Sequence, residues 1–94
     1  MKYRSRTDIT SQILEAAIGG ATKSKIMYKS FLSFEQLKEY LDVLVKNGLL
    51  AYDKSTPFLY KTTSKGQKFV SMNNELSEYL SKPEYQRPAR AAMA

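Results

Sequence analysis

A helix with a clear start and a clear end is the feature that most constrains the fold of this 94-residue chain. Ser33 is placed to accept a hydrogen bond from the amide three residues later, and Gln36 is placed to reach back, which makes a capping box. Apolar residues then recur at helical spacing, and Gly48 follows where a helix ends in a left-handed turn. These apolar residues are Leu37, Leu41, Leu44 and Val45. The pattern predicts an amphipathic helix over residues 34–47.

The segments on either side of this helix predict a shorter helix and a β-hairpin. Thr22 is a suitable N-cap for a helix that runs into the tight turn before the long helix. After the long helix, residues 49–52 and 58–62 are apolar, β-branched or aromatic, and residues 53–57 have turn composition. A helix, a tight turn, a second helix and a hairpin make a winged helix-turn-helix, whose usual role is to bind duplex DNA.

The N-terminal part predicts one more helix. Ser5 and Asp8 form a second capping box, and Asp8 also suits the positive end of the helix dipole. Apolar residues at helical spacing extend this helix to about Ile18, where two glycines follow. In the next helix along the chain, Ile26 and Met27 are expected to face the core.

The C-terminal part predicts a last helix and a tail. Thr63 is a suitable cap for a helix over residues 64–81, and Pro83 ends it. The expected fold class is therefore mainly α with a small β-hairpin. The expected divisions are a winged helix-turn-helix domain over residues 1–63, a C-terminal dimerisation helix over residues 64–82 and a tail over residues 83–94.

Apolar residues of the last helix are spaced three and four residues apart, which indicates a packing seam. So much apolar surface on one side is more than a small monomer readily covers. We expect two copies to pair antiparallel through this helix, while Val70 turns back onto the rest of the chain. The alternative is that the whole seam packs on the first helix as a fourth core helix. The predicted dimer interface consists of Phe69, Met72, Leu76, Tyr79 and Leu80.

The composition leaves few groups for catalysis or metal binding. The chain has no cysteine and no histidine, so it lacks the commonest general base and the commonest metal ligands. We expect neither an enzyme nor a cofactor or metal site, and no small-molecule ligand is evident.

No segment has the length and apolar character of a membrane span. The longest run without a charged residue is seven residues, far below the roughly 20 of a spanning helix. The basic N-terminus has no apolar stretch behind it, as a signal peptide would. The expected location is cytoplasmic, in association with the nucleoid and without a membrane partner.

The net charge of +6 is unevenly distributed along the chain. Residues 1–32 carry a net charge of +4 and residues 51–68 carry +3, whereas residues 33–50 carry −1 and residues 69–94 are neutral. The long helix is expected to turn these charged residues outward: Glu35, Glu39, Asp42 and Lys46. Carboxylates repel phosphates, so we expect this helix to approach a DNA groove by its end and not by its side.

Base contacts are therefore expected at the start of the long helix, from Ser33, Phe34, Gln36 and Lys38. Gln36 suits adenine, because a glutamine amide pairs with this base through two hydrogen bonds. Phosphate contacts are expected from the basic groups and free amides around it: Arg4, Arg6, Lys23, Ser24, Lys25, Lys54 and Lys61. Solubility alone explains any one of these basic residues, but several of them flanking one helix-turn-helix favour phosphate binding.

Most aromatic residues are expected in the core or half-buried. This group consists of Tyr28, Phe31, Phe34, Tyr40, Tyr52, Phe58 and Tyr60. Two short strands offer little room for the stacked aromatic platform that single-stranded nucleic acids require.

Several short motifs in the chain point to one known family. They are Arg4-Ser5-Arg6, Lys25-Ile26-Met27-Tyr28-Lys29, Asn47-Gly48-Leu49-Leu50 and Tyr60-x-Thr62-Thr63-x-Lys65-Gly66. In these motifs, over about residues 2–80, the chain resembles the archaeal ten-kilodalton winged-helix DNA-binding proteins. The resemblance implies a winged helix, a C-terminal helix that pairs antiparallel in a dimer, and DNA binding in a chromatin-like or regulatory role. Pro83 limits the last helix to about 18 residues, or roughly 27 Å, so we expect a smaller dimer than the long coiled coils of that family form.

We therefore expect a dimeric winged-helix protein that binds double-stranded DNA as a transcriptional regulator or a chromatin-associated protein. The alternative is a winged helix that serves as a protein–protein interaction module in a larger assembly, which the acidic face of the long helix favours. The two hypotheses differ in whether the basic groups of the second helix and the hairpin share a face with Ser33 and Gln36.

Overall fold

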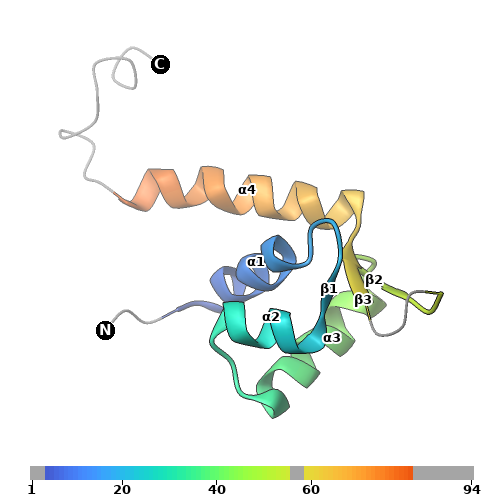
Figure 1. Ribbon diagram of the computed structural model, residues 1–94. Coiled ribbons are helices and arrows are strands. Elements are labelled where there is room, and N and C mark those ends of the chain that lie inside the picture. The colour runs from blue at the N-terminus through green and yellow to red at the C-terminus, as the bar shows by residue number, and fades with distance from the viewer. Residues whose placement is uncertain (1–3, 56–58, 82–94) are drawn as a thin grey trace.

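The computed structural model describes residues 4–55 and 59–81, and it leaves the side chains of residues 80 and 81 undescribed. Within these ranges the chain forms four helices and three short strands (Figure 1). In chain order they are α1 (Arg6–Ala16), β1 (Ala21–Thr22), α2 (Lys23–Ser30), α3 (Phe34–Lys46), β2 (Leu50–Asp53), β3 (Leu59–Thr62) and α4 (Ser64–Ser81). The expected fold class is confirmed, while the predicted tail over residues 83–94 and the position of Phe58 lie outside the described residues.

The helices begin at the residues that the capping signals predict. The Ser33 Oγ accepts a hydrogen bond from the Gln36 amide at 3.2 Å, and the Gln36 Oε1 accepts one from the Ser33 amide at 3.0 Å. The same reciprocal pair of bonds opens α1 at Ser5. The predicted end of α1 at Ile18 is wrong by two residues, because the Ala17 carbonyl instead accepts the amides of Gly20 and Thr62.

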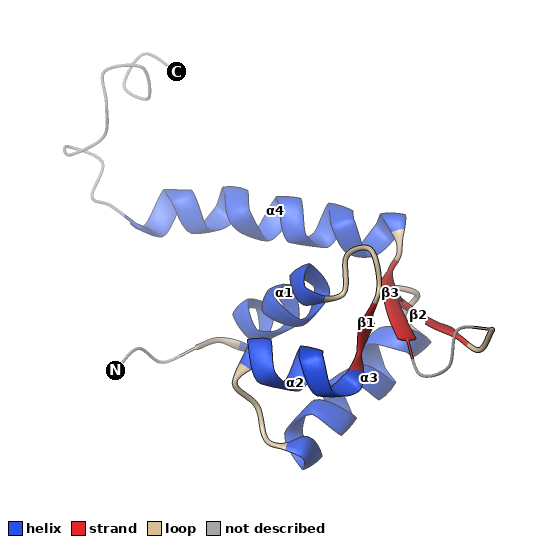
Figure 2. Cartoon of the chain, viewed as in Figure 1, coloured by secondary structure: helices blue, strands red, loops and turns tan. Residues whose placement is uncertain are grey.

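The predicted hairpin forms, with its strands at residues 50–53 and 59–62 where 49–52 and 58–62 were expected. It carries a third strand that the sequence did not indicate. The sheet is antiparallel in the order β1–β3–β2, with Ala21 opposite Tyr60 and Leu50 opposite Thr62 (Figure 2). β1 has only two residues, so no alternation of apolar and polar side chains marks it.

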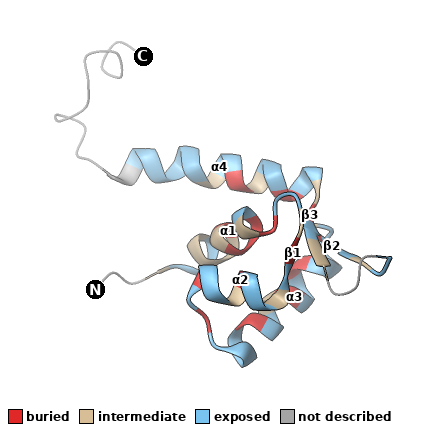
Figure 3. Ribbon diagram, viewed as in Figure 1, coloured by how far each residue is buried: buried red, intermediate tan, exposed pale blue. Residues whose placement is uncertain are grey.

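The core lies where α1, α2, α3 and the start of α4 meet (Figure 3). Its buried hydrophobic residues are Ile13, Leu14, Ala17, Ala21, Ile26, Leu32, Leu37, Leu41, Leu44, Leu50 and Val70. The inward positions predicted for Ile26 and Met27 are confirmed, with Ile26 fully buried and Met27 packed against the core. The inward turn of Val70 is confirmed as well.

α4 begins in close contact with the hairpin. A Cβ atom on Gly66 would overlap the Leu49 carbonyl oxygen, so only glycine lets the helix lie this close to the chain before β2. The Thr63 Oγ1 donates to the Gly48 carbonyl at 2.6 Å, and the Thr62 Oγ1 donates to the Leu14 carbonyl at 2.6 Å. These contacts fix the direction in which α4 leaves the domain.

The rest of α4 extends beyond α1 (Figure 1). It exposes a stripe of apolar side chains. Met72, Leu76 and Tyr79 are 55%, 62% and 73% exposed, whereas Phe69 is half-buried against the core. The alternative of a fourth core helix therefore holds for Phe69 and Val70 and not for the three residues of the stripe. The side chain of Leu80, also assigned to the predicted dimer interface, lies outside the described part of the chain.

The expected burial of the aromatic residues is wrong for four of them. Tyr28, Phe31, Phe34 and Tyr52 are exposed. Only Tyr40 and Tyr60 are half-buried as expected. The reason lies partly in the length of α2, an eight-residue helix whose inner face is filled by Ile26, Met27 and Ser30, so that Tyr28 points outward.

Candidate nucleic-acid interface

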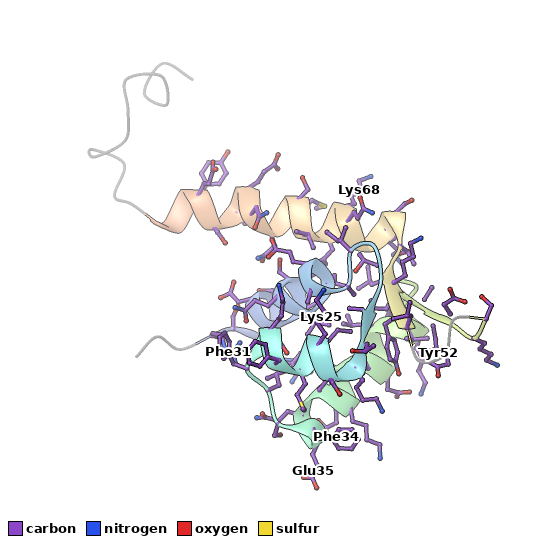
Figure 4. All side chains as sticks on the ribbon, viewed as in Figure 1. Lys25, Phe31, Phe34, Glu35, Tyr52 and Lys68 are labelled. Atoms are coloured by element: carbon purple, nitrogen blue, oxygen red, sulfur yellow. The ribbon has the colours of Figure 1, made fainter. Side chains whose placement is uncertain are left out.

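The starts of α2 and α3 lie side by side. The Lys23 Nζ is 4.9 Å from the centroid of the Phe34 ring, a cation–π contact between the first residues of the two helices. Phe34 and Glu35 mark the exposed lower end of α3 (Figure 4). A basic group from α2 therefore lies at the end of α3 where base contacts are expected.

The N-terminal end of α2 is positively charged and open to solvent. The Thr22 Oγ1 accepts the Lys25 amide at 3.2 Å, while Ser24 and Lys25 have exposed side chains. The first amides of a helix have no partner within it and favour an anion, as does the helix dipole. No acidic residue occurs between Glu15 and Glu35, so no carboxylate from this part of the sequence opposes the lysines.

The capping box restricts what Gln36 does at the α3 end. Its Oε1 accepts the Ser33 amide, so one of the two acceptor positions of the oxygen that a two-bond contact with adenine uses is occupied by the cap. The structure thus gives Gln36 a capping role in addition to its predicted role in base recognition. Lys38, one turn from Phe34, is exposed and makes no such contact in the described residues.

An acidic groove separates α3 from the hairpin. It has a volume of about 800 Å³ and is lined by Lys23, Glu35, Lys38, Glu39, Leu41, Asp42, Val45, Tyr52 and Tyr60. Three carboxylates and two lysines give its lining a net negative charge. The outward position predicted for the acidic residues of α3 is confirmed, and this side of α3 is electrostatically unsuited to phosphates.

The hairpin turns its tyrosines and its lysine to opposite faces. Tyr52 and Tyr60 are directly opposite in register, with ring centroids 5.0 Å apart, and both line the groove. Burial, and to a smaller degree the neighbouring Tyr52, raises the pKa of Tyr60 above its ordinary value. Lys61 pairs with Ala51 and so points to the other face of the sheet.

The predicted phosphate-binding residues are therefore not all brought together. Lys23, Ser24 and Lys25 share the start of α2 beside the α3 end, whereas Lys61 lies on the face of the hairpin away from the groove. Lys54 is exposed and directly follows β2, so it lies in the turn of the hairpin and not at the helix starts.

The two N-terminal arginines make contacts within the protein. Arg4 donates to the Ser30 carbonyl at 2.6 Å, to the Phe31 carbonyl at 3.3 Å and to the Gln12 side chain. It thereby ties the start of the chain to the turn between α2 and α3. The Arg6 guanidinium lies 5.4 Å from the centroid of the Tyr40 ring. Both residues thus have a structural role beside the predicted phosphate role.

In the described part of the chain, no three or more acidic side chains are placed to hold a metal ion together. Over the same residues, no helix is long and apolar enough to cross a membrane.

Comparison with known proteins places this geometry in a family. Residues 3–81 match the winged helix-turn-helix family. The chain belongs to this family. Its winged helix-turn-helix fold is similar to the crystal structure of Sso10a-2, a DNA-binding protein from Sulfolobus solfataricus, with a TM-score of 0.73, 22% sequence identity and 83% of each chain covered. No curated protein matches the chain. The winged helix-turn-helix family and fold that the resemblance implied are confirmed.

Tyr52 is a groove residue that the sequence did not indicate as part of a site. Its neighbour across the hairpin, Tyr60, is half-buried, and the two rings form the wall of the groove opposite α3. The strand register indicates this position for Tyr52, because residues opposite each other in a hairpin share one face. That register depends on the hairpin turn, which the composition of residues 53–57 does not fix.

Proposed function

We propose that this protein binds duplex DNA through the N-terminal ends of α2 and α3. The observation that carries the proposal is the contact between Lys23 and Phe34, which joins a basic helix start to the exposed end of α3. Ser24 and Lys25 follow Lys23 in the first turn of α2, and helix amides there are available to a phosphate. The proposed interface thus contains both kinds of group that a helix-turn-helix uses, one for phosphates and one for base edges.

In this proposal the acidic groove determines how α3 is oriented toward the DNA. The carboxylates of Glu39 and Asp42 lie along α3 beyond its first turn, where side-on insertion would bring them against the DNA backbone. An end-on approach directs Phe34 and Lys38 at the base edges and keeps Glu39 and Asp42, further along α3, away from the phosphates. In this arrangement the capping bond to Ser33 sets the orientation from which the Gln36 amide contacts a base.

We also propose a homodimer formed through α4. The apolar stripe of Met72, Leu76 and Tyr79 is exposed in a single chain and repeats at the three- and four-residue spacing of helix pairs. Antiparallel pairing of two such stripes covers both and separates the two DNA-binding ends. Two ends about 34 Å apart fit successive major grooves on one side of a duplex.

The proposed role is that of a binding protein and not of an enzyme. A winged helix-turn-helix fold with a basic face suits either a transcriptional regulator or a chromatin-associated protein, and both roles place it in the cytoplasm on the nucleoid. A dimer that holds two grooves at a fixed separation is compatible with either role.

Fluorescence anisotropy with a labelled random-sequence duplex tests the proposed interface. The double variant Lys23→Ala/Lys25→Ala should weaken binding roughly tenfold for each lost phosphate contact at about 0.1 M salt. Lys68→Ala, which removes an exposed lysine from α4, is the matched control and should leave the affinity within twofold. If Lys68→Ala lost half as much affinity on a logarithmic scale as the double variant, which removes twice the charge, only the net charge would matter and the proposed interface would be wrong.

The acidic groove supports a second candidate function, a docking site for a basic protein segment. Its net negative lining and its two tyrosines suit lysine or arginine side chains better than phosphates. Glu39→Gln/Asp42→Asn discriminates the candidates, because removing two carboxylates should strengthen duplex binding but weaken capture of a basic peptide.

A further inference from the structure

The two most exposed large hydrophobic side chains in the described part of the chain are neighbours at the end of α2. Tyr28 is 80% exposed and Phe31 is 79% exposed. They are three residues apart, with Tyr28 in the last turn of α2 and Phe31 at its C-cap. Packing within the domain therefore explains neither ring.

The backbone at Phe31 is also unfavourable for this residue type. Phe31 has φ 57° and ψ 41°, and it is the one residue other than glycine with a positive φ among residues 4–55 and 59–81. Glycine or asparagine is the usual residue at such a left-handed helix end, and a bulky side chain there is strained. A strained backbone that carries an exposed aromatic ring indicates a functional position.

Two exposed lysines lie on the same helix as Tyr28, and the backbone at Phe31 is held in place. Lys25 and Lys29 lie three residues before and one residue after Tyr28 on the exposed side of α2, which Figure 3 shows largely in pale blue. No carboxylate occurs in the sequence from residue 16 to residue 34. Arg4 donates to the carbonyls of Ser30 and Phe31, which fixes the loop that presents the second ring.

We propose that the aromatic–lysine face, formed by Lys25, Tyr28, Lys29 and Phe31, binds single-stranded DNA. Unpaired bases stack on aromatic rings, while lysines beside the rings neutralise the phosphates between them. A duplex has its base faces covered by neighbouring bases, so this face selects unpaired strands. The charge of the face favours nucleic acid over a second copy of this basic protein.

The aromatic–lysine face overlaps the proposed duplex interface only at Lys25. Figure 4 shows Phe31 beyond one end of α2 and Phe34 at the lower end of α3. The inference thus goes beyond the proposed function and does not depend on it. Lys25 is the one residue common to both surfaces, so the experiment uses Lys29.

The test compares two labelled 15-mers by fluorescence anisotropy, one of thymidine and one of the same sugar–phosphate chain without bases. The full-length protein should bind the thymidine strand more tightly than the base-free strand. Tyr28→Ala/Phe31→Gly should weaken thymidine binding about five- to 100-fold per stacked base and leave base-free binding unchanged. Glycine adopts the backbone conformation of Phe31 without strain, so this variant should fold.

Control variants separate stacking from general effects. Ile18→Ala removes another exposed apolar side chain and should leave single-strand binding unchanged. Lys29→Ala should lower the salt slope for the thymidine strand by about 0.7, whereas Lys68→Ala should not. Lys23→Ala should weaken binding of duplex and leave the preference for thymidine over the base-free strand intact, so failure of duplex binding is distinguishable from failure of this inference.

Three results would overturn the inference. The first is equal binding of both 15-mers by the unaltered protein. The second is an equal loss of thymidine binding in Ile18→Ala and in the double variant. The third is a double variant that retains thymidine binding but loses self-association in sedimentation, because the face would then bind a second copy of the chain.

Discussion

Lys23 and Phe34 are the first residues of α2 and α3, and the ammonium group of one lies 4.9 Å from the ring centroid of the other. The contact joins the two helix starts directly, in addition to the turn that connects the helices through the chain. A cation–π contact at a half-exposed ring contributes about 0.5–1 kcal/mol. It therefore positions Lys23 beside the start of α3, and the charge of the lysine stays available to a phosphate.

A double-mutant cycle measures this contact. Lys23→Met and Phe34→Leu each remove one partner of the contact. The loss in free energy of unfolding in the double variant should be about 0.5–1 kcal/mol smaller than the sum of the losses in the two single variants. Urea denaturation of the four proteins provides the values. Strictly additive losses would show that the two side chains do not stabilise each other.

Gly66→Ala should destabilise the fold, although alanine is the better helix former. The new methyl group would overlap the Leu49 carbonyl oxygen, which belongs to the backbone and moves only with the hairpin. Overpacking of this kind costs about 1–3 kcal/mol, which exceeds the roughly 1 kcal/mol gained in helix propensity if the backbone stays fixed. Thermal unfolding should show a lower Tm for Gly66→Ala than for Gln67→Ala, an exposed change in the same turn of α4. A higher Tm for Gly66→Ala would mean that α4 is not seated against Leu49 as closely as described.

Arg4→Met tests whether the N-terminal arginine acts within the fold. Its guanidinium donates to the carbonyls of Ser30 and Phe31, so its loss leaves carbonyl groups of the α2 end without this donor. We expect the free energy of unfolding to fall by about 1–3 kcal/mol, and Arg4→Lys to recover only part of it because lysine lacks the forked donor geometry. The salt slope of duplex binding should stay unchanged. A stable Arg4→Met protein with a slope reduced by about one would identify Arg4 as a phosphate contact instead.

Leu76→Glu tests the proposed dimer. A carboxylate in the middle of the apolar stripe should give folded monomers, because Leu76 is 62% exposed in the single chain. Asn74→Glu is the matched control, since a residue two positions away lies on nearly the opposite side of a helix. Sedimentation velocity at roughly 100 µM should show a dimer for the unaltered protein and for Asn74→Glu, and a monomer for Leu76→Glu. A monomeric unaltered protein at that concentration would contradict the dimer.

The helices could be predicted from the sequence because their signals are local. Ser5, Thr22 and Ser33 each cap a helix at the expected residue, and the apolar spacing of α3 identifies its buried side. The strand β1 could not be predicted, because two residues carry no period and pair only once β3 is in place. The same limit applies to the end of α1, where a hydrogen bond from the distant Thr62 competes with the helix.

The candidate interface was predictable in its residue types but not in its layout. The basic start of α2 and the acidic face of α3 follow from the order of charges along each helix. The separation of Lys61 from Tyr60 depends on strand register, and the contact between Lys23 and Phe34 depends on how two helices cross. The exposure of Tyr28 and Phe31 was missed, because aromatic residues are buried more often than not and the short inner face of α2 was already filled.

Duplex binding by the ends of α2 and α3 is tested most directly by the dependence of affinity on salt. A labelled duplex of about 20 base pairs should be titrated with the full-length protein at several salt concentrations between about 50 and 300 mM. Neutralisation of four to six phosphates predicts a slope of log affinity against log salt of about −4 to −5, with an affinity for random sequence that is roughly micromolar or weaker at physiological salt. A flat salt response, or no duplex binding at about 50 mM salt, would contradict duplex recognition and leave protein docking in the acidic groove as the function.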